Sequence, residues 1–330
     1  TFQAISYIID VYRGIIKHEK NILLFSDYII FFPQLIAGPI LRANEVIWQL
    51  NTRPKFNYIF IEEGIKRILI GLFLKLVIAD NIAPYVDTAF AIDSIELSPF
   101  DVLTMAFLFG FQIYFDFSAY SHIAIGSAKL MGINFPENFN FPYSSTSPKI
   151  FWKRWHISLS SWVRDYLYLP ITGSQFKTKS LGGFDLENTS LKFRIVISLF
   201  FSWAVMGLWH GAGWNFIIWG ITHAIIIYVF RVFPYKFDSI NKKLKNLISW
   251  GITLVLVMLA WIPFRSENLE QTIYLWKSLF NFDHILILNF RENFYLITLG
   301  LLIFVITASY FNENQEKFKN LKLFNTSLYS

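Results

Sequence analysis

The sequence predicts an all-α, polytopic membrane protein, and its composition, aromatic content and long apolar runs carry that prediction. Of the 330 residues, 54% are hydrophobic and only 16% are charged, whereas a soluble domain has about 25% charged residues. Aromatic residues make up 19% of the chain, and the mean hydropathy is +0.43. One water-soluble core could not bury this much apolar surface. We therefore expect residues 1–330 to form a single multi-span membrane domain.

Charge and cysteine content narrow the function classes. The net charge is +6, but the basic residues lie mostly between apolar runs, where Lys and Arg mark cytoplasmic loops and anionic headgroups. We accordingly expect membrane lipids, and not nucleic acid, as partners. The chain has no cysteine, which excludes disulfides, thiolate metal sites and a Cys nucleophile. No signal-peptide pattern is visible, and the abrupt helical start at Thr1 predicts a fragment that lacks N-terminal helices.

The first apolar runs differ in how closely they match the pattern of a membrane-spanning helix. Residues 22–41 are interrupted by two prolines and a glycine, so we expect a broken or re-entrant segment. Residues 64–83 and 99–127 are predicted spans, since about 20 residues cross a bilayer. The polar, proline-bearing stretch 135–148 follows them as a loop.

Residues 149–169 predict one amphipathic helix with an aromatic face. Its apolar residues recur at steps of three and four, which places them on one helical stripe: Trp152, Trp155, Leu159, Trp162 and Tyr166. Such a helix suits the membrane interface or packing against other spans. Pro170 is expected to end it.

The last apolar runs complete the predicted bundle. Residues 195–230 hold two runs that break at Gly211-Ala-Gly213, and residues 247–264 and 294–311 are two more spans. Basic residues dominate the loop after 230, which should therefore be cytoplasmic: Arg231, Lys236, Lys242, Lys243 and Lys245 against Asp238. The C-terminal tail carries three lysines, which also predict a cytoplasmic position: Lys317, Lys319 and Lys322.

His210 stands at the expected helix break, between Trp209 and Gly211. The run 195–209 would rise about 22 Å from the cytoplasmic side, less than the ~30 Å hydrocarbon core. His210 is thus expected inside the membrane, nearer the outer face. We favour a functional role over a structural hydrogen bond between helices, because ionisable groups inside a membrane are functional by default.

Two other polar residues leave alternatives open. His156 lies on the predicted amphipathic helix, where it is either functional or a headgroup contact. Asp116 is flanked at i±4 by Gln112 and Tyr120 inside an apolar span. It either orients a catalytic group or, as the simpler interpretation, links helices by hydrogen bonds.

Other kinds of site find little support. The chain has no P-loop, no dinucleotide fingerprint, no paired-histidine metal motif and no nucleophile elbow. His122 and His223 are expected as packing residues. A transporter or channel remains an alternative, since Lys75, Asp116 and the broken run 195–230 fit an ion or substrate path.

Four runs of this sequence resemble the membrane-bound O-acyltransferase (MBOAT) family. They are Asn138-Phe-Asn-Phe-Pro-Tyr143, Phe151-Trp-Lys-Arg-Trp-His-Ile-Ser-Leu-Ser160, Arg164-Asp-Tyr-Leu-Tyr-Leu-Pro170 and Leu208-Trp-His-Gly-Ala-Gly-Trp214. The branch that this chain resembles most is that of the alginate O-acetyltransferase membrane subunit. The resemblance covers most of residues 1–230.

The resemblance implies an MBOAT-type multi-helix bundle with His210 as the catalytic residue and His156 as the second signature residue. We expect His210 to take the proton of an acceptor hydroxyl as it attacks a thioester carbonyl. His156 would orient the donor or the tetrahedral intermediate. Substrate contacts are expected from Asp116, Trp155, Trp209, Asn215 and Arg154.

The implied activity is acetyl transfer from a cytoplasmic acyl thioester, either acetyl-CoA or an acyl carrier, to hydroxyls of an extracytoplasmic polysaccharide. No bound cofactor and no metal are expected. The resemblance also implies periplasmic or surface accessory acyltransferase proteins and a multi-pass position in the cytoplasmic (inner) membrane. An alternative keeps acyl transfer but moves D-alanyl or another acyl group from a carrier protein to a cell-wall polymer.

Overall fold

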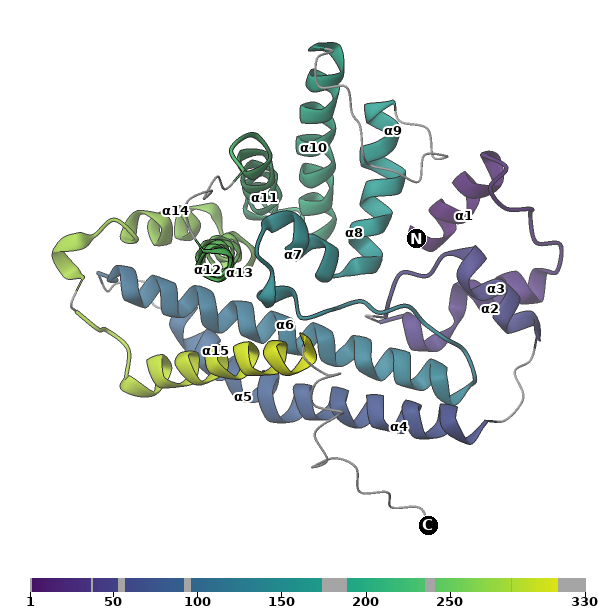
Figure 1. Cartoon of the computed structure of the whole chain (residues 1–330), viewed down its shortest axis with the longest axis horizontal. Helices are drawn as coiled ribbons and strands as arrows, with labels where there is room; N and C mark the ends of the chain where they lie inside the picture. The colour runs from purple at the N-terminus through teal and green to yellow at the C-terminus, as the bar shows by residue number, and fades with distance from the viewer. Residues whose placement is uncertain are drawn as a thin grey trace.

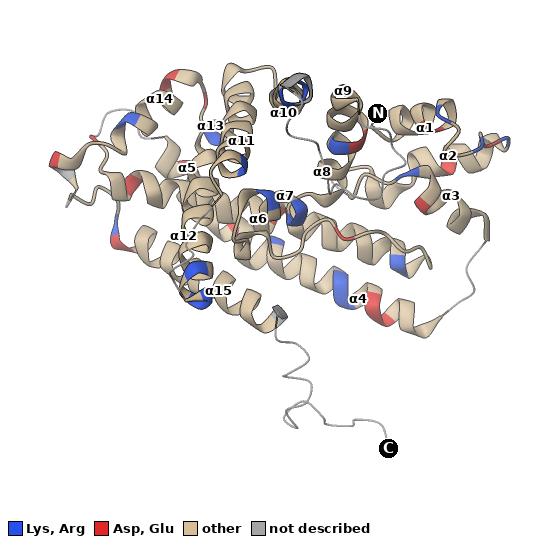
Figure 2. Cartoon of the chain, turned by 45° about the horizontal axis from the view of Figure 1, so that its top comes forward, with Lys and Arg blue, Asp and Glu red and all other residues tan. Residues whose placement is uncertain are grey.

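The computed structural model describes residues 2–36, 38–52, 57–91, 96–173, 189–234, 241–285 and 287–313. Within these ranges the chain forms helices and no strand. Six of the helices are long and apolar enough to cross a membrane, which confirms the all-α, polytopic fold. Most of the ribbon in Figure 2 is free of charged residues, as expected for helices that face lipid or one another.

The N-terminal region forms short helices that do not span. Its elements are α1 (Phe2–Tyr12), α2 (Ile22–Ile30), the 3-10 turn η1 (Phe32–Gln34) and α3 (Ala43–Thr52). The side chain of Asn21 caps α2 by accepting from Leu23 N at 3.0 Å, and nine residues rise only about 14 Å. The expectation of a broken segment over residues 22–41 is therefore confirmed.

Two long helices form the base of the molecule. The chain runs without interruption through α4 (Tyr58–Leu72), the π-helical η2 (Phe73–Ala79) and α5 (Asp80–Phe90), and returns in α6 (Pro99–Leu130). α4 and α6 lie side by side across Figure 1. They approach closely because glycines face each other: a Cβ on Gly126 would lie 2.7 Å from Gly64 O. Both predicted spans are confirmed, and both are longer than expected.

The predicted single helix over residues 149–169 is wrong. After the turn η3 (Pro142–Ser144), the segment forms two helical stretches. The first is α7 (Pro148–Arg154), and the second runs through α8 (Ile157–Val163), the π-helical η4 (Arg164–Tyr168) and α9 (Leu169–Thr172). The helix breaks at Trp155 and His156 because residues 138–140 capture its backbone: Asn140 N donates to Arg154 O and Ile157 N donates to Asn138 O, both at 2.9 Å.

The aromatic stripe of that segment is buried, which supports packing against spans over an interfacial position. Trp155 and Trp162 are only 3% and 4% exposed. The second stretch also continues two residues beyond Pro170, to Thr172. The π-helical turn of η4 precedes the proline, and there the N–H of Leu169 bonds to Arg164 O, five residues back.

The C-terminal half holds the remaining long helices. They are α10 (Thr189–His210), α11 (Trp214–Val232), α12 (Lys242–Ala260) and α15 (Glu292–Glu313). Between α12 and α15 lie the shorter elements α13 (Ile262–Arg265), α14 (Leu269–Ser278) and the turn η5 (Phe282–His284). The predicted break at residues 211–213 is confirmed. Lys236, Asp238 and the tail lysines Lys317, Lys319 and Lys322 lie outside the described residues.

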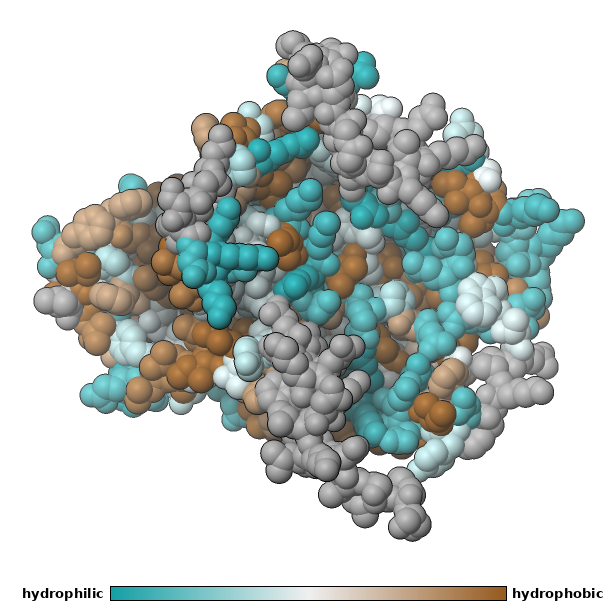
Figure 3. Space-filling model, viewed as in Figure 1, coloured by the Kyte–Doolittle hydropathy of each residue, from teal (hydrophilic) through white to brown (hydrophobic). Residues whose placement is uncertain are grey.

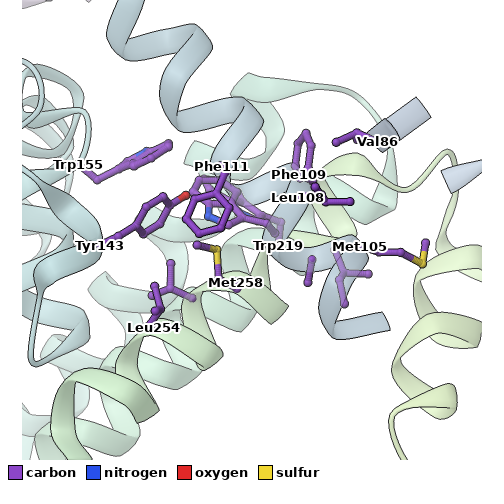
Figure 4. Packing of buried hydrophobic residues seen from close by; sticks show 14 of the residues in the cluster. Val86, Met105, Leu108, Phe109, Phe111, Tyr143, Trp155, Trp219, Leu254 and Met258 are labelled. Carbon is purple, nitrogen blue, oxygen red and sulfur yellow. The ribbon is translucent and has the colours of Figure 1, made fainter. Parts of the chain in front are cut away.

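An aromatic core lies where α6, α7, α11 and α12 meet. Figure 4 shows Tyr143, Phe111 and Trp155 close to Trp219, with Met258 beneath them. Outside the core, α15 and the Tyr58–Phe90 rod expose many large apolar side chains, such as Leu76 and Leu299. On the face seen in Figure 3, hydrophobic side chains gather over α14 and α15. The fold thus places its aromatic side chains around the segments that carry His156 and His210.

Candidate active site

His156 occupies a strained backbone position between two helices. Its φ is +40° and its ψ is 57°, in the left-handed region that residues other than glycine seldom adopt. Phe141, on the loop that captures the helix break, is the other described non-glycine residue with positive φ. Such strain persists where the surrounding hydrogen bonds enforce it, and it gathers at functional sites.

The ring of His156 is enclosed on most sides. The residue is 5% exposed, its ring meets Phe117 edge-on at 4.6 Å between centroids, and its Nδ1 lies 3.1 Å from Asn138 Oδ1. Burial, and to a smaller extent the charge of nearby His210, lowers the pKa of His156 from 6.5 to about 3. The imidazole is therefore neutral at physiological pH.

His210 ends α10, and a tight helical hairpin positions it. α10 and α11 pack against each other through glycines: a Cβ on Gly207 would lie 2.3 Å from Phe216 O, and one on Gly220 would lie 2.2 Å from Trp203 O. No side chain larger than hydrogen fits at these two positions without moving the backbone. The hairpin therefore fixes the end of α10 closely against α11.

Aromatic rings surround His210 without binding its nitrogens. Its ring lies 5.1 Å from Trp219, 5.0 Å from Phe264 and 4.6 Å from Trp209, between centroids. Among the described residues, none forms a hydrogen bond with either ring nitrogen of His210. Contacts with these three aromatic rings thus hold the imidazole in place, while its two nitrogens stay available to a substrate.

A hollow of about 420 Å³ lies beside His156. His156 and Trp209 line this hollow, and His210 follows Trp209 directly in the chain. The other lining residues come from α1, α2, η1, residues 38–40 and α6: Phe2, Gln3, Ile29, Ile30, Gln34, Leu35, Ile36, Gly38, Pro39, Ile40 and Phe117. Two motifs 54 residues apart in the sequence thus converge beside one space.

The other predicted substrate contacts are spread more widely. Trp209 faces the hollow and is 49% exposed. Trp155 is buried between Phe139 and Trp261. Arg154 donates to Ser144 Oγ. Trp209 alone among these three lines the space beside the histidines.

Asn215 and Asp116 have protein partners. Asn215 ties α11 to α13, since its Nδ2 donates to Pro263 O at 3.2 Å and to Ser266 O at 3.0 Å. Asp116 lies in an ion pair with Lys75 at 2.7 Å, and the same Lys75 Nζ contacts Asp80 at 2.8 Å. This pairing corresponds to the simpler of the two interpretations of Asp116.

Sequence reasoning assigned no role to three polar residues around His156. Asn138, Ser121 and Ser158 are all buried, and they connect the loop, α6 and α8 by hydrogen bonds. Asn138 does stand in one of the runs that carry the family resemblance, which was the available signal. No group of three or more His, Asp or Glu side chains that could hold a metal ion occurs in the part of the chain that the structure describes.

The fold and the site together define a polytopic helical membrane protein with two histidines at helix breaks, one of which lines a hollow. The model of the MBOAT, membrane-bound O-acyltransferase family matches residues 15–264. The chain therefore belongs to this family.

Relatives of this chain include proteins with three different named activities. The "Probable alginate O-acetylase AlgI" of Azotobacter vinelandii is 40% identical over 281 residues, 85% of this chain and 52% of that protein. The "Peptidoglycan O-acetyltransferase" of Helicobacter pylori is 35% identical over 84% of this chain and 55% of that protein. The "Teichoic acid D-alanyltransferase" of Bacillus subtilis is 31% identical over 78% and 63%, respectively. The chain spans about half the length of the alginate O-acetylases that it matches.

Proposed function

We propose that this chain carries the catalytic centre of an O-acyltransferase that moves an acetyl group from a thioester to a hydroxyl of a polysaccharide. One observation carries the proposal: His156 and His210, from separate motifs, lie near each other, His156 and Trp209 line one hollow, and His210 has both ring nitrogens unbonded among the described residues. The alginate O-acetylase and peptidoglycan O-acetyltransferase relatives support acetyl and a polysaccharide.

The proposed reaction needs one base and no covalent enzyme intermediate. The acceptor oxygen attacks the thioester carbonyl carbon while His210 takes the hydroxyl proton. The C–S bond then breaks, and the departing sulfur receives the proton to leave as a thiol. The donor, acetyl-CoA or an acyl carrier, would approach from the cytoplasm. The acceptor would come from outside the cytoplasmic membrane, where accessory acyltransferase proteins would act.

Acetyl transfer by the full-length protein in lipid nanodiscs tests this proposal. With labelled acetyl-CoA and alginate oligosaccharides, His210→Ala should lower kcat by about 10² to 10⁴-fold, the usual contribution of a general base. His18→Ala is the matched control, because His18 is exposed and does not line the hollow. Normal turnover by a folded His210→Ala variant would exclude His210 as the base.

The teichoic acid D-alanyltransferase relatives support a second candidate, transfer of D-alanyl from a carrier protein. The same preparation distinguishes the two when it is offered a D-alanyl carrier and a teichoic acid in place of acetyl-CoA and alginate. Product from that pair alone would reassign the acyl group and keep the role of His210.

A further inference from the structure

The side chain of Asn138 lies at the centre of a buried hydrogen-bond network. The residue has no exposed surface. Its amide contacts α6 through Ser121 and α8 through Ser158, and it contacts the ring of His156. Each hydrogen bond in this network has a donor and an acceptor. Backbone N–H groups can only donate, so they determine where the protons of the neighbouring side chains lie.

A backbone group fixes the orientation of the Asn138 amide. The N–H of Ser158 lies 3.3 Å from Oδ1 of Asn138, and a backbone N–H can only donate. The atom that it faces must therefore be the oxygen. On the other side, Nδ2 donates to Ser121 Oγ at 3.1 Å, which agrees with this orientation.

A second backbone group fixes the hydroxyl of Ser158. Ile40 N donates to Ser158 Oγ at 2.9 Å, and this hydrogen bond occupies one of the two lone pairs of the hydroxyl oxygen. The hydroxyl proton points to Asn138 Oδ1, at 2.9 Å, because the other atom that Ser158 Oγ faces, Nδ1 of His156, is farther away at 3.5 Å. Oδ1 is thus an acceptor toward every group around it.

The proton of His156 follows from these assignments. Its Nδ1 lies 3.1 Å from Asn138 Oδ1, and two lone pairs at that distance would repel each other, so Nδ1 carries the proton. A neutral imidazole has a single ring proton, which leaves Nε2 as an acceptor. Nε2 has no hydrogen bond within the described residues, and it is not enclosed as Nε2 of His223 is. It is therefore open to the hollow that His156 lines.

We propose that Asn138 is a positioning residue that keeps the proton of His156 on Nδ1, so that Nε2 accepts a hydrogen bond from the acceptor substrate. This inference rests on the proposed acyl transfer. The bound group is a hydroxyl next to the one that gives its proton to His210, as neighbouring hydroxyls of a sugar ring allow. An unprotonated Nε2 cannot donate to an oxyanion, so His156 holds the acceptor and not the tetrahedral intermediate.

Nitrogen NMR of the full-length protein in nanodiscs, with ¹⁵N-labelled histidine, tests the proton position directly. The His156 signals are assigned by their loss in His156→Gln. The wild type should show Nδ1 protonated and Nε2 unprotonated. Asn138→Asp and Ser121→Ala should keep that pattern, since an acceptor still faces Nδ1, whereas Asn138→Ala should populate the Nε2–H form. A wild-type spectrum with the proton on Nε2 overturns the proposal without any variant.

Kinetics test the consequence for the substrate. Asn138→Ala should raise the KM for an alginate oligosaccharide about tenfold, the value of one hydrogen bond, and leave the KM for acetyl-CoA unchanged. Ser278→Ala is the control and should change neither constant, because the Ser278 hydroxyl donates to Tyr274 O within α14, outside this network. Equal changes in both KM values would overturn the assignment to the acceptor. Absence of acetyl transfer by the wild type would instead refute the proposed function, while the NMR result still decides the proton position.

Discussion

Two groups of ionisable side chains lie within the apolar part of this molecule, and they differ in what surrounds them. His156 and His210 are packed among aromatic rings and keep ring nitrogens unbonded within the described residues, and His156 lines a hollow. Lys75 of η2 pairs with two carboxylates, those of Asp80 in α5 and Asp116 in α6. An ionisable residue in an apolar run therefore does not mark a site by itself. A site requires polar atoms that the protein leaves free and a space for them to face.

The hairpin that holds His210 gives the largest expected effect. Gly220→Ala would place a Cβ 2.2 Å from Trp203 O, so α10 and α11 must separate. We expect a loss of about 3 kcal/mol in unfolding free energy and a fall in kcat, because the end of α10 moves with the helix. Thermal unfolding and acetyl transfer measured on the same preparation check both.

Gly251→Ala is the control for that variant. Gly251 lies in α12, and a Cβ there would meet no atom within 4 Å. The substitution should leave the stability unchanged or raise it by up to about 1 kcal/mol, the helix preference of Ala over Gly. If both variants behaved alike, the close approach of α10 and α11 would not be what positions His210.

The ion-paired group should respond to mutation in stability more than in activity. Lys75→Met leaves two carboxylates without their cation, and we expect a loss of about 2 kcal/mol, below the 3–5 kcal/mol of a fully buried pair because these side chains are partly exposed. Asp116→Asn should cost less, since Lys75 keeps Asp80. A double-mutant cycle on unfolding temperatures measures the coupling.

The activity of these variants tests the substrate contact that the sequence predicted for Asp116. We expect kcat per folded molecule to fall less than tenfold in Asp116→Asn. A loss as large as that of His210→Ala would place Asp116 in the reaction, and the contrast between the two groups would then fail.

The smallest effect is a dependence of stability on pH through His156. Its pKa is about 3 in the folded protein against 6.5 when unperturbed, so between these values the unfolded chain binds more protons and stability falls as the pH falls. The change from pH 6.5 to pH 5.5 should cost about 1 kcal/mol. Unfolding at the two pH values should show a flatter dependence in His156→Gln. An identical slope in that variant would mean that His156 is not buried as the structure has it.

The sequence determined the class of fold and the family, and it singled out His156 and His210 as the site to test. Apolar runs near bilayer length, with charges between them, are visible without a structure because the membrane requires a local pattern in the chain. The break at residues 211–213 was equally local, since Gly-Ala-Gly after His210 interrupts a helix.

Only the tertiary structure decided how the site is assembled. The stripe from Trp152 to Tyr166 repeats with a helical period, yet the chain breaks at His156 because residues 138–140 bind the backbone on either side of it. The sequence left two roles open for Asp116, and the fold showed its ion pair with Lys75, 41 residues earlier in the chain. Hydrogen bonds and ion pairs between distant segments leave no periodic signal in a sequence, so the pairing of Asp116 and the proton position of His156 depended on the fold.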